Sequence, residues 1–137
     1  MAKEIPPLPE GTYGWRVGEG DLASVVDPSR PGTYPPVFAT SRMVALMEMA
    51  AGQCLAPLLD DGEMSVGVVV NIQHLAATPA GAEVSARARY LGRAGKLYRF
   101  EVVAFDPGGE IGRGEHHRAI ISRERLLAGA AKRRGTD

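Results

Sequence analysis

The feature that most constrains the fold is a change of periodicity in the middle of the chain. From Thr40 to about Leu59 the apolar residues recur at a helical spacing, whereas the segments that follow have the pattern of strands. The apolar residues of the helical segment share a stripe roughly 140° wide, and they are Met43, Val44, Met47, Ala50, Ala51, Cys54, Leu55 and Leu58. Thr40 stands where an N-cap is expected, and Asp60-Asp61-Gly62 ends the helix.

Four strand-like segments follow the helix and are joined by short Gly- and Pro-containing turns. They are residues 65–78, 83–91, 97–105 and 111–122. Connections this short favour antiparallel neighbours. The strand at 97–105 becomes apolar on both faces at its far end, so we expect it to be central. Two short apolar pieces before the helix, 13–17 and 22–26, are further candidate strands.

A single helix with an apolar stripe must bury that stripe, and the sheet is the available surface. The sequence therefore predicts an α+β hotdog fold, in which an antiparallel sheet wraps around one long central helix. Its edge strand would be covered by a second copy, which gives a homodimer or a higher homo-oligomer. We expect one domain over 1–137, with an irregular arm at 1–12 and a helix fading into a basic tail at 123–137.

Composition excludes several classes of protein. The 137 residues are 45% hydrophobic and 23% charged, with a net charge of +0, which argues against disorder and against a nucleic-acid partner. The one cysteine, Cys54, excludes a disulfide within the chain and a cysteine-built zinc site. There is no secretory signal pattern and no run of 18 apolar residues, so we expect a cytoplasmic protein without a membrane partner.

Glu48 is the first candidate for chemistry, because it falls at the margin of the apolar stripe between Met47 and Met49. A carboxylate in apolar surroundings loses hydration, which raises its pKa and suits a general base or a nucleophile. The alternative is an ordinary glutamate that reaches solvent from the edge of a helix.

Three more residues each have two interpretations. Thr40 is either only a cap or part of an anion site at the positive end of the helix dipole. His74 is either a packed strand residue or an acid–base group. Gly67 marks either a simple bulge or a close backbone approach, where its N–H would polarise a carbonyl.

The run GRGEHHRAII contains His116, His117 and Arg118. Adjacent histidines on a strand point to opposite faces, so they do not readily chelate one metal, and we expect no metal site. His116 and Arg118 are two residues apart and share a face, where they would hold a phosphate or carboxylate. The alternative is a solvated polar face.

The segment VFATSRMVALMEMA, residues 37–50, resembles the fluoroacetyl-CoA thioesterase family of the hotdog superfamily. The resemblance continues over about residues 34–122, through Gly67, His74, the AATPAG break and the pair His116 and Arg118. It is carried by the joint spacing of the FAT motif, the glutamate, the glycine and the histidine rather than by any one of them.

The resemblance implies an acyl-CoA thioesterase with a catalytic set of Thr40, Glu48 and His74, and with Gly67 and Arg118 near the acyl group. Glu48 would act as base or nucleophile on the thioester carbonyl. Thr40 and His74 would orient the substrate or water, and His74 would protonate the departing thiolate. It also implies a site at a dimer interface and no cofactor beyond the coenzyme A of the substrate.

One part of the resemblance is incomplete. The fluoroacetyl-specific enzyme has a phenylalanine-lined lid before the FAT motif, whereas this chain reads SRPGTYPPVF, with Tyr34 in place of one aromatic and Phe38 retained. A small or short acyl-CoA is therefore the expected substrate class. The alternatives are a non-catalytic hotdog module that binds acyl-CoA or a small acid, and a hydratase, whose Asp/His segment is not found.

Overall fold

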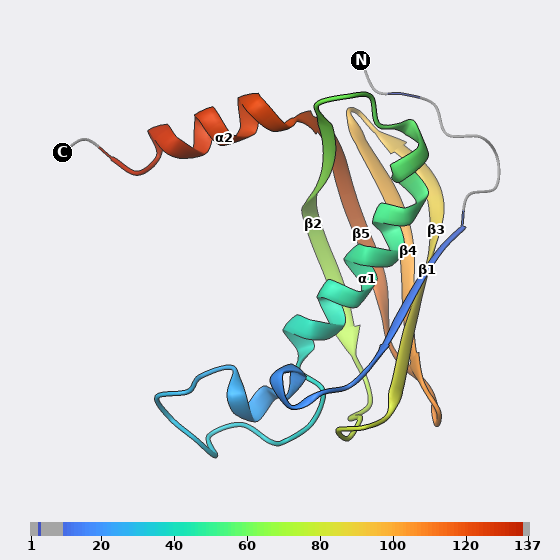
Figure 1. Cartoon of the computed structure of the whole chain (residues 1–137). Helices are drawn as coiled ribbons and strands as arrows, with labels where there is room; N and C mark the ends of the chain where they lie inside the picture. Colours follow the sequence, from blue (N-terminus) through green and yellow to red (C-terminus); the bar gives the residue numbers. More distant parts are fainter. Residues whose placement is uncertain (1–2, 4–9, 136–137) are drawn as a thin grey trace.

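The computed structural model describes residue 3 and residues 10–135. It is built around one five-stranded antiparallel sheet whose strand order is β1-β3-β4-β5-β2 (Figure 1). The strands are β1 (Glu10–Arg16), β2 (Glu63–His74), β3 (Glu83–Ala94), β4 (Leu97–Asp106) and β5 (Gly109–Ser122). The strand that we expected to be central, β4, lies in the middle of the sheet.

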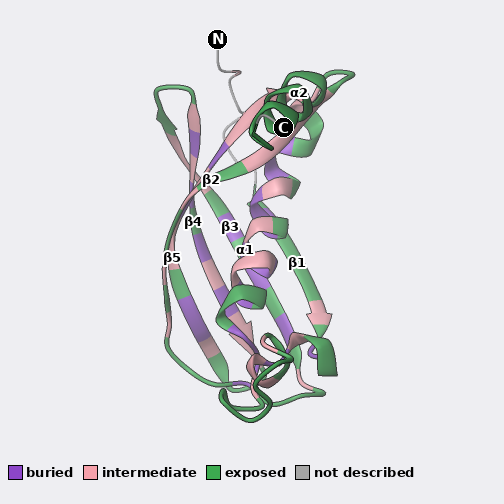
Figure 2. Cartoon of the chain, turned by 90° about the vertical axis from the view of Figure 1, so that its left-hand side faces the viewer, coloured by how far each residue is buried: buried purple, intermediate pink, exposed green. Residues whose placement is uncertain are grey.

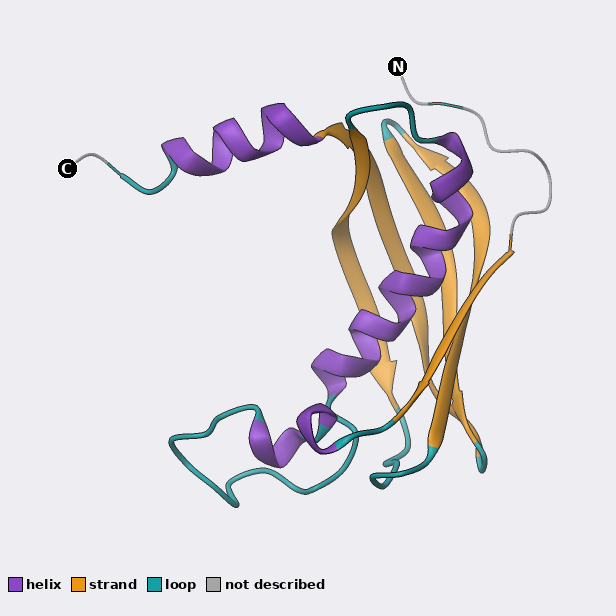
Figure 3. Cartoon of the chain, in the orientation of Figure 1, coloured by secondary structure: helices purple, strands orange, loops and turns teal. Residues whose placement is uncertain are grey.

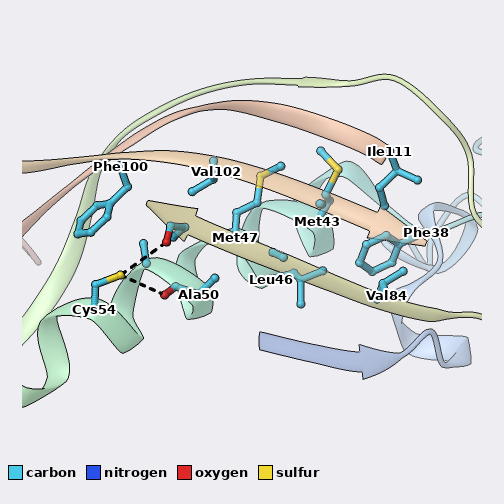
Figure 4. Packing of buried hydrophobic residues seen from close by; sticks show 14 of the residues in the cluster. Phe38, Met43, Leu46, Met47, Ala50, Cys54, Val84, Phe100, Val102 and Ile111 are labelled. Carbon is cyan, nitrogen blue, oxygen red and sulfur yellow. Dashed lines mark hydrogen bonds between the residues drawn. The ribbon is translucent and has the colours of Figure 1, made fainter. Parts of the chain in front are cut away.

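Helix α1 (Thr40–Leu55) lies across one face of this curled sheet and ends in the short 3₁₀ turn η3 (Ala56–Leu58) (Figures 1 and 3). Its apolar side forms the core against β1, β3, β4 and Phe38 (Figures 2 and 4). The predicted stripe is confirmed with two corrections. Leu46 is fully buried, whereas Val44 and Leu58 are only half-buried, and the α-helix ends at Leu55 rather than near Leu59. The α+β hotdog arrangement predicted from the order of elements is therefore present.

Two expectations for the N-terminal part were wrong. The segment 22–26 is not a strand but follows the 3₁₀ turn η1 (Glu19–Asp21) into a second one, η2 (Ala23–Val25). Most of its backbone bonds are local, from Val25 N to Leu22 O and from Val26 N to Ala23 O. Its pairing with the segment before α1 is limited to one isolated bridge, Leu22 with Phe38, and the bond from Ala23 N to Val37 O. Strand β1 begins at Glu10, within the arm expected through residue 12; residues 1–2 and 4–9 lie outside the described residues.

The two ends of the sheet differ in length. Strand β1 has 7 residues, whereas the opposite edge strand β2 has 12 and pairs only with β5 among the described residues. The C-terminal helix α2 (Arg123–Lys132) is capped by Ser122 and projects away from the sheet on the β2 side (Figure 1). Over the described part of the chain, no helix is long and apolar enough to span a membrane.

Candidate active site

Thr40 and His74 meet where the start of α1 faces the end of β2. The Thr40 Oγ1 and His74 Nδ1 atoms are 2.8 Å apart, a hydrogen bond across 34 residues of sequence. Thr40 is therefore not the N-cap that we expected: Ala39 occupies that position, and no side chain caps the helix. The Thr40 hydroxyl is directed to His74 instead, so no side chain caps the electropositive start of α1.

A pocket of about 390 Å³ opens beside this pair. Its lining includes four of the residues singled out from the sequence, namely Tyr34, Phe38, Thr40 and His74. Phe38 is buried beneath it, whereas Tyr34 is 53% exposed on the loop before α1. The pocket therefore combines an apolar floor with a hydroxyl and an imidazole at its polar end.

The surroundings of His74 disfavour its charged form. Burial is the main cause that lowers its pKa below the usual 6.5, while the backbone of Ala76 acts in the opposite direction. Its Nε2 atom is buried and has no hydrogen-bond partner among the described residues. Because buried polar atoms are nearly always paired, an unpaired imidazole nitrogen beside a pocket is well placed to contact a ligand.

A second polar cluster lies around Glu48, halfway along α1. The Glu48 Oε2 atom is 3.5 Å from Arg118 Nη1 and 4.0 Å from His116 Nε2. The Glu48 side chain is 38% exposed. The Glu48 carboxylate therefore loses only part of its hydration, whereas the helical wheel suggested a more apolar setting. It faces nitrogen atoms of His116 and Arg118 as well as the apolar margin of the helix.

Gly67 allows this approach. A β carbon at position 67 would overlap Glu48 Oε2 and would lie 3.1 Å from His116 Cε1. The strand is irregular here, because the pairing of β2 with β5 shifts register between Gly67 and Val69. The bulge and the close backbone approach are therefore both present at Gly67, whereas the role of its N–H in polarising a carbonyl stays a prediction.

His116 and Arg118 share one face of β5, as their spacing predicted. His116 is 1% exposed and Arg118 is 9% exposed. His117 points to the other face, where it contacts Glu115. Sequence reasoning missed Ser65, whose hydroxyl and carbonyl oxygens accept hydrogen bonds from Arg118 at 3.1 and 3.0 Å. The one available signal was its position two residues before Gly67, on the same strand face.

The two clusters are separate within one chain. Thr40 and Glu48 are eight residues apart on α1, which corresponds to about 12 Å along the helix axis. A larger hollow of about 600 Å³ lies elsewhere, between α2 and the start of β4, and contains none of the site residues predicted from the sequence. The described residues contain no group of three or more His, Cys, Asp or Glu side chains that would hold a metal ion.

Comparison with known proteins assigns this arrangement to a family. The family described as "Fluoroacetyl-CoA-specific thioesterase" matches residues 17–124. The chain belongs to the fluoroacetyl-CoA-specific thioesterase family. The fluoroacetyl-CoA thioesterase of Streptantibioticus cattleyicolor is 42% identical over 95 residues, which cover 69% of this chain and 68% of that protein.

Solved structures agree with this assignment. The fluoroacetyl-CoA thioesterase FlK superposes with a TM-score of 0.87 at 34% identity, over 98% of this chain and 100% of that one. A thioesterase superfamily member from Thermus thermophilus gives a TM-score of 0.84 at 27% identity, over 96% and 95% of the two chains. Like the other members of the fluoroacetyl-CoA-specific thioesterase family, this protein is a thioester hydrolase.

Proposed function

We propose that this enzyme hydrolyses a small or short-chain acyl-CoA to the free acid and coenzyme A, with Glu48, Thr40 and His74 as its catalytic residues. The observation that carries the proposal is the Thr40–His74 hydrogen bond at the uncapped start of α1, beside a pocket. A structure of a FlK mutant in complex with fluoroacetate and CoA supports the substrate class.

His74 and Thr40 would orient the thioester. When the Thr40 hydroxyl donates to His74 Nδ1, the proton of the neutral ring lies on Nε2, which is buried and has no partner among the described residues, in a side chain that lines the pocket. That N–H would donate to the thioester or to the departing sulfur. The N–H groups at the start of α1, or that of Gly67, would stabilise the oxyanion that develops on the carbonyl oxygen.

Glu48 would act as the general base or as the nucleophile. As a base, its carboxylate takes a proton from water while the water oxygen bonds to the carbonyl carbon. The C–S bond then breaks, and the proton passes to the thiolate of coenzyme A. As a nucleophile, Glu48 would attack the carbonyl carbon and expel the thiolate of coenzyme A, which takes a proton from His74. Water then hydrolyses the resulting acyl anhydride to the free acid and restores the Glu48 carboxylate. Arg118 would hold the carboxylate in place for either route.

A dimer would bring the two clusters together. Strand β2 is a long edge strand whose Val68 and Val70 side chains are 53% and 47% exposed. An unpaired edge of this kind is a template for pairing with another strand. If two copies pair their β2 strands antiparallel, the His74 end of one strand lies beside the Glu63–Gly67 half of the other. The Thr40–His74 pair of one protomer would then complete a site with Glu48 of its partner.

The acyl group would lie in the pocket between Tyr34, Phe38 and the Thr40–His74 pair. Tyr34 stands on an exposed loop and would close over a short acyl chain. A tyrosine brings a polar hydroxyl where the fluoroacetyl-specific lid has a phenylalanine, so selectivity for fluorine is not part of the proposal. Fluoroacetyl-CoA is one member of the substrate panel that tests it.

The test is release of coenzyme A thiol from acetyl-, fluoroacetyl-, butyryl- and phenylacetyl-CoA by wild type and by Glu48→Gln. Burial raises the pKa of the Cys54 thiol to about 11, so the native protein contributes little thiolate to a thiol assay. We expect turnover of at least one thioester and a fall of at least ~100-fold in kcat for Glu48→Gln, the size of a typical acid–base contribution.

The matched control is Glu124→Gln, which changes an acidic residue of α2 in the same way but lies outside both clusters. It should keep the wild-type rate. Wild-type turnover by Glu48→Gln would remove Glu48 from the mechanism. Calorimetric binding of an acyl-CoA without turnover by the wild type would favour the alternative, a binding module that keeps the pocket without the chemistry.

A further inference from the structure

His116 is a buried histidine next to the Glu48 cluster whose hydrogen bonds determine its protonation. Its Nδ1 atom is 2.8 Å from the carbonyl oxygen of Val69. A carbonyl oxygen only accepts, so Nδ1 must carry the proton and donate it. The other nitrogen, Nε2, is 3.1 Å from Arg118 Nη1. A guanidinium only donates, so Nε2 must accept. Both contacts are satisfied only by a neutral ring with its proton on Nδ1.

The surroundings of His116 favour the same state. Burial is the main cause that lowers the pKa of His116 below 6.5. The hydrogen bond to the Val69 carbonyl is the largest cause in the opposite direction; Arg118 and His117 lower the pKa further, and Glu48 raises it. A protonated ring would lose the lone pair that accepts from Arg118 and would place two positive charges in contact.

Arg118 is held on three sides. Its Nε and Nη2 atoms donate to the hydroxyl and carbonyl oxygens of Ser65, and its Nη1 atom is shared between His116 and Glu48. The distance from Nη1 to Glu48 is 3.5 Å, whereas its distance to His116 is 3.1 Å. A full arginine–carboxylate bond is shorter, at about 2.7–2.9 Å. The Nη1 group of Arg118 therefore makes its shorter hydrogen bond to His116 and only a long contact to Glu48.

We infer that His116 is a positioning residue that acts through Arg118: as a neutral acceptor it retains the Nη1 donor and prevents Arg118 from closing a full ion pair on Glu48. Its catalytic consequence rests on the function proposed above. A carboxylate locked in a short ion pair is a weaker base and a weaker nucleophile, whereas one held by a long contact stays oriented and reactive.

The first test needs no activity. Nitrogen-15 NMR of the imidazole rings of the wild-type protein reports which nitrogen carries the proton. We expect one histidine with protonated Nδ1 and unprotonated Nε2 from pH 6 to 8, assigned to His116 by the disappearance of its signals in His116→Gln. A His116 ring protonated on Nε2, or on both nitrogens, over this range would overturn the inference even if thioester hydrolysis is observed.

The second test compares two substitutions at the same position. The side-chain amide of His116→Gln offers an oxygen near the place of Nε2, so it can still accept from Arg118, whereas His116→Leu keeps the apolar volume and loses the acceptor. We expect kcat to fall about tenfold or more in the leucine variant, with KM nearly unchanged and the acidic limb of the kcat–pH profile moved to lower pH. The glutamine variant should recover most of the rate and the wild-type profile.

The matched control is His117→Gln, which alters the neighbouring histidine on the opposite face of β5 and should leave kcat and the pH profile as in wild type. Urea unfolding measures the free energy of unfolding of each variant, so a fall in kcat in a variant that stays folded is assigned to lost positioning rather than to lost folding. If the leucine and glutamine variants lose activity equally and neither moves the pH profile, His116 only fills space. If the wild type releases no coenzyme A, the proposed function fails, and the NMR result still decides the state of His116.

Discussion

The backbone of Gly67 on β2 packs so closely against the Glu48 carboxylate on α1 that no β carbon fits between them. This contact joins the middle of the helix to the edge strand of the sheet at the position where the register of β2 shifts. The identity of residue 67 therefore determines where the Glu48 carboxylate can lie.

Substitution Gly67→Ala should displace Glu48 and reduce kcat by at least about tenfold, because misplacing a catalytic group by even about 1 Å is costly. The control is Gly52→Ala. Gly52 lies within α1, and a β carbon added there meets nothing within 4 Å. In a helix that change should stabilise the protein by roughly 0.5–1 kcal/mol. Thiol-release kinetics and urea unfolding measure both effects, and equal kinetics for the two variants would contradict the close-approach argument.

Thr40→Val should lower kcat by about tenfold, the free-energy equivalent of one lost hydrogen bond of about 1.4 kcal/mol. Valine keeps the branched shape of threonine and removes the hydroxyl that contacts His74 Nδ1. Thr40→Ser keeps the hydroxyl and should retain most of the rate. If the valine variant turns over as fast as the serine variant, the Thr40–His74 bond has no part in the reaction.

A charge on the exposed edge of β2 should disrupt the proposed dimer. In Val70→Lys, the ammonium would lie at the strand edge, where lysine opposes strand pairing. We expect light scattering to show a shift from dimer toward the 14.6 kDa monomer, together with a fall in turnover of at least about tenfold. Val25→Lys, on a 3₁₀ turn and 45% exposed, should change neither property. A monomeric wild type with full activity would exclude the shared site.

The two histidines with lowered pKa should make the protein less stable as the pH falls. The folded-state pKa of both His74 and His116 lies below the usual 6.5, mainly through burial. Between the folded and unfolded values the unfolded chain binds more protons, so the free energy of unfolding rises with pH and is lost as the pH drops below about 6.5. Urea unfolding at pH 7.5 and 5.5 measures this slope.

His116→Gln should flatten part of that slope, whereas His117→Gln should preserve it, because both of the histidines with lowered pKa remain. The acidic residues whose pKa is lowered, Glu63, Glu110 and Glu115, titrate below this range and do not obscure it. Stability that is constant from pH 7.5 to 5.5 would contradict the assignment of both rings as neutral in the folded state.

The sequence by itself determined the helix, the four strands after it and the hotdog arrangement, because hydrophobic periodicity depends only on which residues alternate along the chain. It also determined that His116 and Arg118 share a face, and it left Gly67 open between a simple bulge and a close approach. The strand expected at 22–26 was wrong for a physical reason. Apolar residues at 22–26 pack against Phe38 or lie exposed without pairing as a strand, and pairing depends on a neighbour that local pattern does not reveal.

Only the tertiary structure decided which groups meet. The bond between Thr40 and His74 spans 34 residues, and that between Ser65 and Arg118 spans 53, so no local spacing encodes them. Thr40 has the sequence position of a cap, yet its hydroxyl bonds to His74 because the end of β2 comes within reach. The same holds for His116. Its protonation follows from the Val69 carbonyl on β2 and from the Arg118 guanidinium on β5, the strand that also carries His116. Hydrogen bonds require positions in space, and the packing of α1 on the sheet provides them.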